Sequence, residues 1–208
     1  MSSIQSGNFT FTTTSIDGVI IVDVKSYGDS RGSFMETYKQ PDFAAGGIDV
    51  DFVQDNQSSS TKGVLRGLHF QIEHPQSKLV RVVSGAVYDV AVDLRRGSPT
   101  YLQWTGVVLS AESKEMLYIP KGFAHGFLTL TDDVEVLYKV DVGYAPESDR
   151  SIRFDDPQIE RDFAVPIELV DECKDRDAPL STDFEEFLGL RLDAFRRVDH
   201  HYRAVDRH

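Results

Sequence analysis

Short stretches rich in β-branched and aromatic residues recur between Ile20 and Val140, and Gly, Pro, Asp and Ser separate them. Strands of this length and spacing predict an all-β sandwich or barrel. Ser84 and Gly85 predict a tight turn between two of these strands. The predicted strands span residues 20–24, 79–83, 86–94, 107–109, 116–119, 127–130 and 134–140.

Two segments instead carry helix signals. Residues 41–47 have Pro near their start and Gly at their end, which predicts a short helix. A capping-box pattern begins at Thr182, and apolar residues follow it at helical spacing, which predicts a C-terminal helix. We therefore expect one domain over residues 1–181, followed by a C-terminal helix and tail over residues 182–208.

Composition fits a water-soluble globular domain. The chain has 208 residues, of which 40% are hydrophobic and 27% are charged. No apolar run approaches the roughly 20 residues of a membrane span. The polar N-terminus lacks the features of a signal peptide. The single cysteine, Cys173, fits a reducing compartment, so we expect a cytoplasmic location.

The net charge of -12 argues against nucleic-acid binding, because the chain has no basic stripe. The same negative charge also bears on how the protein could bind an anionic ligand. An anionic ligand must be held by a few local cations, because the global field repels it.

The segment from Lys62 to Gln71 combines one histidine, one arginine, one lysine and two glycines within an otherwise apolar run. Histidine can take and give a proton near neutral pH. Arginine offers a planar fork to an anion. The segment alone is equally compatible with a surface strand that has a solvated Arg66 and a packed His69.

Histidines in a β-barrel are typical of cupins, most of which bind a metal. Residues 120–125 match the later part of the cupin metal motif, with His125 as the ligand. The earlier part of the motif differs. His69 is the first of its two histidines, but Gln71 stands at the position of the second, and Lys78 stands where a carboxylate is expected. An ammonium group repels a cation, so we predict no metal and acid–base chemistry by side chains instead. Two roles are open for His125: structural support of the pocket and direct catalysis.

Several short motifs stand in a fixed order along the chain: residues 29–36, 54–58, 62–71, 76–82, 94–100, 119–126, 138–139 and 174–175. Together they resemble the dTDP-4-dehydrorhamnose 3,5-epimerase family over about residues 16–180. Two departures stand out. Phe154 occupies a position where the family commonly has tryptophan, and the region after residue 180 does not follow the family closely.

The resemblance implies an all-β cupin jelly roll that forms a homodimer. It implies an isomerase that epimerises a dTDP-4-keto-6-deoxyhexose at C3 and C5 without a cofactor. The small-molecule nucleotide sugar is then the expected ligand, with no nucleic acid and no membrane as partner. The early segment is expected to lean toward the partner subunit, so that two chains build one pocket.

The resemblance also implies catalytic roles. His69 is expected to be the base, Asp175 to orient its imidazole, Lys78 to stabilise charge on O4, and Tyr138 to be the acid. Strand alternation supports an inward Tyr138, because it shares a face with apolar neighbours. Composition alone treats Asp175 as one more exposed acid in a polar run that also holds Asp177.

Substrate-binding roles follow from the same resemblance. Two arginines are expected to grip the diphosphate, an aromatic ring to pack on the base or the sugar, and amides to bind the sugar or diphosphate, while no role is clear for Glu36. The expected substrate-binding residues are Arg31, Phe34, Glu36, Gln54, Asn56, Arg66 and His125.

Three alternatives remain open at this stage. An enzyme that epimerises only C3 or only C5 would keep His69 and Tyr138. A non-catalytic sugar-nucleotide-binding cupin would not need both of them together with Lys78. A metal-dependent cupin oxygenase or isomerase is disfavoured by Lys78.

Overall fold

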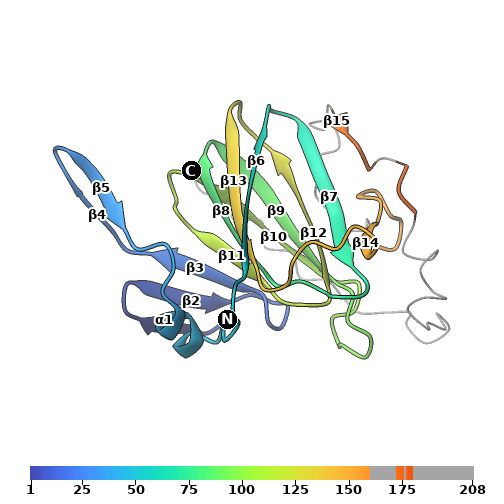
Figure 1. The fold of residues 1–208 in the computed structure, drawn as a ribbon, viewed down its shortest axis with the longest axis horizontal. Coiled ribbons are helices and arrows are strands. Elements are labelled where there is room, and N and C mark those ends of the chain that lie inside the picture. The colour runs from blue at the N-terminus through green and yellow to red at the C-terminus, as the bar shows by residue number, and fades with distance from the viewer. Residues whose placement is uncertain (160–171, 176, 180–208) are drawn as a thin grey trace.

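Two β-sheets face each other in a jelly roll, as Figure 1 shows, which confirms the predicted all-β cupin class. The structure is a computed structural model, and it describes residues 1–159, 172–175 and 177–179. The predicted C-terminal helix and the proposed boundary between residues 181 and 182 lie outside the described residues. Within the described part of the chain, no helix is long and apolar enough to cross a membrane.

The larger sheet has seven strands, and its neighbouring strands are antiparallel. Across the sheet the order is β1 (Ser3–Ser6), β2 (Phe9–Thr13), β3 (Ile20–Val24), β11 (Met116–Ile119), β8 (Lys78–Ser84), β13 (Val134–Val140) and β6 (Gln54–Ser60).

The second sheet is centred on strands that carry the central motif and its histidines. Its order is β10 (Trp104–Ser110), β9 (Ala86–Asp93), β12 (Phe123–Thr129), β7 (Val64–Gln71) and β14 (Asp149–Ser151), and the short strand β15 (Glu172–Cys173) also pairs with β7.

A separate hairpin of β4 (Ser26–Asp29) and β5 (Gly32–Met35) projects away from the two sheets (Figure 1). The helix α1 (Gln40–Ala45) follows it, with Pro41 in its first turn and Gly46 after its last residue, as the sequence predicts. Its Phe43 is fully buried against Phe9 and Phe11. This packing fixes the base of the hairpin to the outer face of the larger sheet.

The predicted strands are present, with small shifts at their ends. The segments at 20–24, 116–119 and 134–140 match β3, β11 and β13 residue for residue. The segment predicted at 127–130 starts earlier, because β12 also takes in the cupin-motif residues from Phe123 onward. Gly85 forms the predicted turn with a φ of 70°.

Apolar side chains form three layers around the two sheets. The layer between the sheets contains Val80 and Val82 from β8, Val87 and Ala91 from β9, and Phe127 from β12. A second layer covers the outer face of the smaller sheet, and a third covers the outer face of the larger one. The candidate site belongs to the first layer, where polar side chains replace apolar ones toward one end of the strands.

Gly67 allows β7 and β12 to approach closely beside the histidines. Its φ is 114°, a region that favours glycine. A Cβ at this position would lie 2.6 Å from Cα of Gly126 and 2.6 Å from the carbonyl oxygen of His125. The pairing of β7 with β12 shifts register here, which keeps Arg66 and His69 on the same inner face.

Candidate active site

Register places the candidate residues in rows across the inner faces of the two sheets. In the smaller sheet one row runs from Ser151 through His69 and His125 to Ala91. Directly opposed residues on antiparallel strands point to the same face. These side chains therefore point into the space between the sheets.

Two rows of the larger sheet face that space. Gln54, Val140 and Lys78 stand opposite one another on β6, β13 and β8. The next row consists of Asn56, Tyr138 and Val80. The site is thus formed by side chains from both sheets, and strand alternation alone directs them inward.

His69 is paired with a carboxylate that comes from far along the chain. Its Nε2 lies 2.9 Å from Oδ2 of Asp175, and Ser151 donates a hydrogen bond of 2.9 Å to the other carboxylate oxygen. The His69 side chain is 38% exposed, whereas that of Asp175 is 15% exposed. The imidazole is therefore held in one orientation and still has one side open to a ligand.

The structure distinguishes Asp175 from Asp177, which the polar composition of that segment does not. Asp175 contacts His69 and Ser151, while Asp177 is exposed. The pairing of β15 with β7 brings this segment beside the central motif. Residues 106 positions apart in sequence thus form one hydrogen-bonded pair.

His125 forms a second histidine–aspartate pair in the same row. Its Nε2 lies 3.0 Å from each carboxylate oxygen of Asp89. The two side chains are 7% and 0% exposed. Burial lowers the pKa of His125, although the charge of Asp89 opposes this shift. The neutral imidazole is therefore favoured, with the Nε2 proton shared with Asp89.

Lys78 supplies a cation inside the pocket. Burial lowers the pKa of its ammonium group to about 8, and the charges of Asp149 and Asp89 oppose this shift. At neutral pH the side chain is still mostly protonated. A weakly solvated cation of this kind interacts strongly with a negative charge that develops beside it.

Tyr138 lies against the apolar layer between the sheets, as strand alternation predicts. Burial raises the pKa of its phenol. The charge of Arg66 lowers this pKa and the charge of Asp149 raises it, both by less than burial does. The hydroxyl therefore stays protonated at neutral pH and can donate a proton. Asp149 influences the pKa of both Tyr138 and Lys78, which places all three in one electrostatic neighbourhood.

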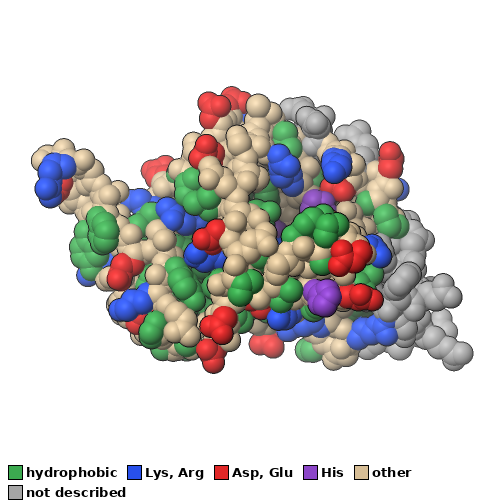
Figure 2. Space-filling model, viewed as in Figure 1, with side chains coloured by type: hydrophobic (Ala, Val, Ile, Leu, Met, Phe, Trp, Pro, Cys, Tyr) green, Lys and Arg blue, Asp and Glu red, His purple; other side chains and the backbone are tan. Residues whose placement is uncertain are grey.

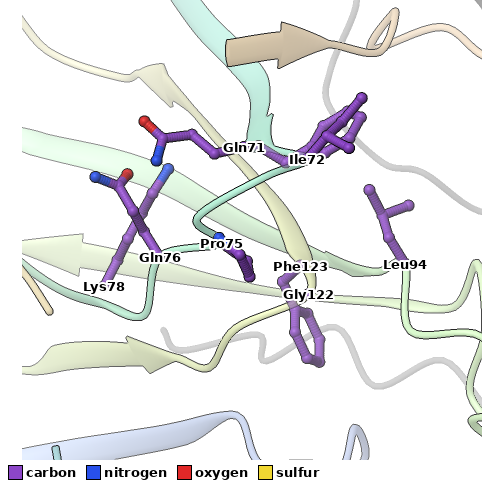
Figure 3. A pocket seen from close by; sticks show the side chains of 9 residues that line it. Gln71, Ile72, Pro75, Gln76, Lys78, Leu94, Gly122 and Phe123 are labelled. Carbon is purple, nitrogen blue, oxygen red and sulfur yellow. The ribbon is translucent and has the colours of Figure 1, made fainter. Parts of the chain in front are cut away.

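A cavity of about 170 Å³ opens beside Lys78. In Figure 3 the polar ends of Gln71, Gln76 and Lys78 gather on one side of it, whereas Ile72 and Leu94 lie on the other. The cavity thus combines one cationic, amide-rich wall with an apolar wall. Among the predicted catalytic residues, Lys78 is the one that lines this cavity.

Comparisons with known proteins establish the family of the chain. Residues 13–183 match the family model described as dTDP-4-dehydrorhamnose 3,5-epimerase. The dTDP-4-dehydrorhamnose 3,5-epimerase of Methanothermobacter thermautotrophicus is 54% identical over 164 residues, which cover 79% of this chain and 88% of that protein. The chain belongs to the dTDP-4-dehydrorhamnose 3,5-epimerase family.

Solved structures of related epimerases share the fold. The crystal structure of the dTDP-6-deoxy-D-glucose-3,5-epimerase from Legionella pneumophila, in complex with dTDP-4-keto-L-rhamnose, has a TM-score of 0.81 and 45% identity. The match covers 86% of this chain and 96% of that one. A 3'-monoepimerase from Streptomyces bikiniensis, in complex with dTDP-quinovose, has a TM-score of 0.74 and 34% identity over 85% and 89% of the two chains.

The loop before β14 in this epimerase-family chain is held at several points. Gln71 donates to the carbonyl of His74 and accepts a hydrogen bond of 2.9 Å from the backbone of Ala145. Gln76 donates to the carbonyl of Val142 at 2.7 Å. Gln71, which stands in place of a histidine of the cupin metal motif, thus uses the two ends of its amide to join the segment after β7 to this loop.

The remaining predicted substrate-binding residues fall into two groups. Gln54 and Asn56 are joined by a hydrogen bond of 2.7 Å on the inner face of β6. Arg66 lies on β7 and donates a hydrogen bond of 2.9 Å to Ser60. Gln54 and Asn56 thus face the space between the sheets, whereas Arg66 is exposed and its charge acts on Tyr138.

The other group is carried by the projecting hairpin and the segment after it. Arg31 is exposed and ion-paired with Asp29 at 2.6 Å, and Phe34 is 69% exposed. Glu36 accepts a hydrogen bond from Asn8. Within this single chain, the structure does not bring these three predicted residues together with His69. Figure 2 shows basic side chains at the hairpin tip and hydrophobic ones along its length.

The motifs did not reveal several polar residues of the site. Asp89 is the partner of His125, Ser151 donates a hydrogen bond to Asp175, and Asp149 acts electrostatically on Lys78. A signal for Asp89 is present in the sequence, because this acid interrupts the apolar run of the strand predicted over residues 86–94. Ser151 has no such signal, since a serine in a short edge strand is ordinary.

The described residues do not fit a metal centre. Among them, no group of three or more His, Cys, Asp or Glu residues is placed to hold a metal ion. His69 and His125 are each turned to a carboxylate of their own, and Lys78 adds a positive charge nearby. A divalent cation at this position would meet an ammonium group in place of a third ligand.

Proposed function

We propose that this protein converts dTDP-4-dehydro-6-deoxy-D-glucose into dTDP-4-dehydro-L-rhamnose by epimerisation at C3 and C5. The observation that carries this proposal is the His69–Asp175 pair, open to a ligand on the inner face of the jelly roll. Lys78 and Tyr138 project from the facing sheet. Family membership supports the substrate class.

The chemistry starts at the ketone. Protons on C3 and C5 are acidic because they flank the C4 carbonyl, and their removal gives an enolate with its charge on O4. His69 takes the proton, and the C–H electron pair moves into the enolate. Asp175 favours the imidazolium that forms and holds the ring in place, while Ser151 holds Asp175.

Lys78 and Tyr138 complete the step. The ammonium of Lys78 stabilises the charge on O4, and such a preorganised contact typically contributes a few kcal/mol. Tyr138 gives its hydroxyl proton to the carbanion carbon from the opposite ring face, which inverts the centre. The imidazolium and the phenolate then exchange protons with solvent. No external oxidant, reductant or metal is required for this balance.

Binding of the nucleotide part requires local cations, because the chain carries a net charge of -12. Arg66 lies at the mouth of the site, and its guanidinium is held by Ser60 and by the carbonyl of Ser59. We assign it to the diphosphate, and we assign Gln54 and Asn56 to the sugar or the diphosphate. The single cysteine supports a cytoplasmic location.

A homodimer explains the hairpin. Arg31 and Phe34 are exposed on an element that extends away from its own sheets. An apolar ring on a projecting hairpin is typical of a contact with another chain. We propose that the hairpin reaches the pocket of a second copy, where Arg31 adds a cation for the diphosphate and Phe34 an apolar surface.

Complementation between two inactive variants tests the shared pocket. His69→Ala removes the base of its own site, and Arg31→Ala with Phe34→Ala removes the hairpin contribution to the partner's site. Mixed after dissociation and reassociation, the variants form heterodimers with one intact site, so about a quarter of the wild-type activity should return. No recovery, with heterodimers present by native mass spectrometry, would show that each chain completes its own pocket.

Solvent deuterium incorporation tests the reaction itself. In D₂O the wild-type enzyme should place deuterium on both C3 and C5 of the 4-keto sugar, with product of inverted configuration at both. Incorporation at one carbon would support a monoepimerase, an alternative favoured by the fold shared with a 3'-monoepimerase. Binding of the nucleotide sugar without any exchange would indicate a non-catalytic protein.

Tyr138→Phe separates the acid from the base in the same assay. We expect the variant to retain much of its deuterium exchange, because His69 remains, while formation of the inverted product falls about 10²-fold or more. Mass spectrometry of substrate and product measures both quantities. Equal losses in exchange and inversion would assign Tyr138 a structural role.

A further inference from the structure

Asp89 is a fully buried carboxylate that takes no direct part in the proposed proton transfers. Both of its oxygens lie 3.0 Å from Nε2 of His125, and its exposure is 0%. A buried charge is costly unless it is paired or serves another charge nearby. The single Nε2–H of a neutral histidine donates to this carboxylate but leaves its negative charge in place.

A second acid on the same strand is neutralised differently. Asp93 lies on the same inner face of β9, four residues further on, and is also fully buried. It accepts hydrogen bonds from the guanidinium of Arg95 at 2.9 Å and from Ser98 and Thr100. Its charge is therefore matched locally by an arginine. Asp89 is left with a charge that can act further into the pocket.

The cation that feels this charge is Lys78. Lys78 faces the space between the sheets from β8, and Asp89 and His125 face the same space from β9 and β12. Asp89, His125 and Asp149 on β14 are the charged or titratable groups that interact with it electrostatically. The two acids favour the ammonium form, whereas burial disfavours it and holds the pKa of Lys78 at about 8. Lys78 therefore titrates close to physiological pH, where a modest change in the surrounding charge alters its protonation.

We propose that Asp89 is a positioning residue: its buried negative charge acts through Lys78, keeping that side chain in the ammonium form that stabilises O4. The inference rests on the function proposed above for Lys78. His125 orients the carboxylate and shields it from solvent. Asp149, at the solvent-facing edge of the sheet, supplies the other attractive charge. In this arrangement Asp89 contributes to catalysis without touching the substrate.

The test is the pH profile of kcat/KM for Asp89→Asn, measured from pH 6 to 10. Loss of the charge should move the alkaline limb of the profile to lower pH by about one unit, with activity recovering toward the wild-type value at the acidic end. A merely structural residue would lower kcat/KM by a similar factor at every pH. Such a uniform loss, with the limb unmoved, would overturn the proposal.

Two further variants sharpen this result. Asp93→Asn removes a buried charge from the same face of the same strand, and its alkaline limb should stay where the wild-type limb lies. Lys78→Arg carries a cation that does not deprotonate in this range. Adding Asp89→Asn to Lys78→Arg should therefore produce no shift, and a shift in that background would contradict an effect through Lys78.

Lys78 can also be titrated without the reaction. Its acylation by acetic anhydride, followed by mass spectrometry across pH, reports the fraction of free amine. The midpoint should fall by about one unit in Asp89→Ser, a smaller variant suited to the site if Asp89→Asn does not fold. An unchanged midpoint would refute the role of Asp89. A shifted midpoint in a protein that does not epimerise the sugar would leave it standing and refute the proposed function alone.

Discussion

Two histidine–aspartate pairs stand in one row of the smaller sheet and differ mainly in burial. His69 is 38% exposed and shares Asp175 with Ser151, whereas His125 is 7% exposed and its Nε2 lies 3.0 Å from both oxygens of Asp89. The same two residue types therefore serve two purposes. The open pair can exchange a proton with a ligand, and the closed pair holds a charge in place. Burial, more than residue identity, decides which role is possible.

Truncating each histidine in turn should give the largest contrast. His69→Ala should lower turnover at least 10³-fold, because the base is lost, while the melting temperature changes little. His125→Ala leaves Asp89 buried without its partner, so we expect unfolding to become easier by about 1–3 kcal/mol. Thermal melts and steady-state rates on both variants measure the contrast. Substantial activity in His69→Ala would reject the assigned mechanism.

The sequence predicted the open pair better than the closed one, for a physical reason. His69 and Tyr138 stand out because polar groups at inward positions of apolar strands are unusual. Asp175 came only from the family resemblance, since nothing in a run of acids distinguishes one of them. Its contact with His69 depends on β15 pairing with β7, a long-range interaction that local patterns do not encode.

Strand β6 shows a similar limit in predicting the fold from the sequence. Its residues are polar throughout, so hydrophobic alternation did not predict it. Its inner positions carry Gln54 and Asn56, which hydrogen-bond to each other and are not part of the apolar core. The family resemblance predicted that the early segment leans toward a second subunit, but the sequence did not predict the hairpin that projects from the two sheets.

Replacing Lys78, the cation on the facing sheet, should have the next largest effect. Lys78→Met removes the charge at O4, and we expect kcat to fall about 10²–10³-fold. Stability should change in the opposite direction. The folded pKa of about 8 lies below the ordinary 10.5, so the ammonium opposes folding by an amount on the order of 1–3 kcal/mol below pH 8.

The sign of the pH dependence follows from this shift. Between pH 8 and 10.5 the unfolded state binds more protons at Lys78 than the folded state, so wild-type stability rises with pH in that window. The stability advantage of Lys78→Met should therefore be largest below pH 8 and shrink toward pH 10.5. Urea titrations at several pH values measure it. A variant that is less stable at pH 7 would show that Lys78 supports the fold.

The smallest expected effect comes from replacing Asp175, and it tests whether the contact between this carboxylate and His69 is specific. Asp175→Asn keeps a hydrogen-bonding group beside His69 but removes the charge that favours the imidazolium, so kcat should fall by about 10²-fold or more. Asp177→Asn, two residues away and exposed, should leave kcat within about twofold of the wild type, as most exposed substitutions do. Comparable losses in both variants would mean that the acidic segment acts through its overall field. A loss confined to Asp175→Asn would locate the effect in the hydrogen bond that only this carboxylate makes with His69.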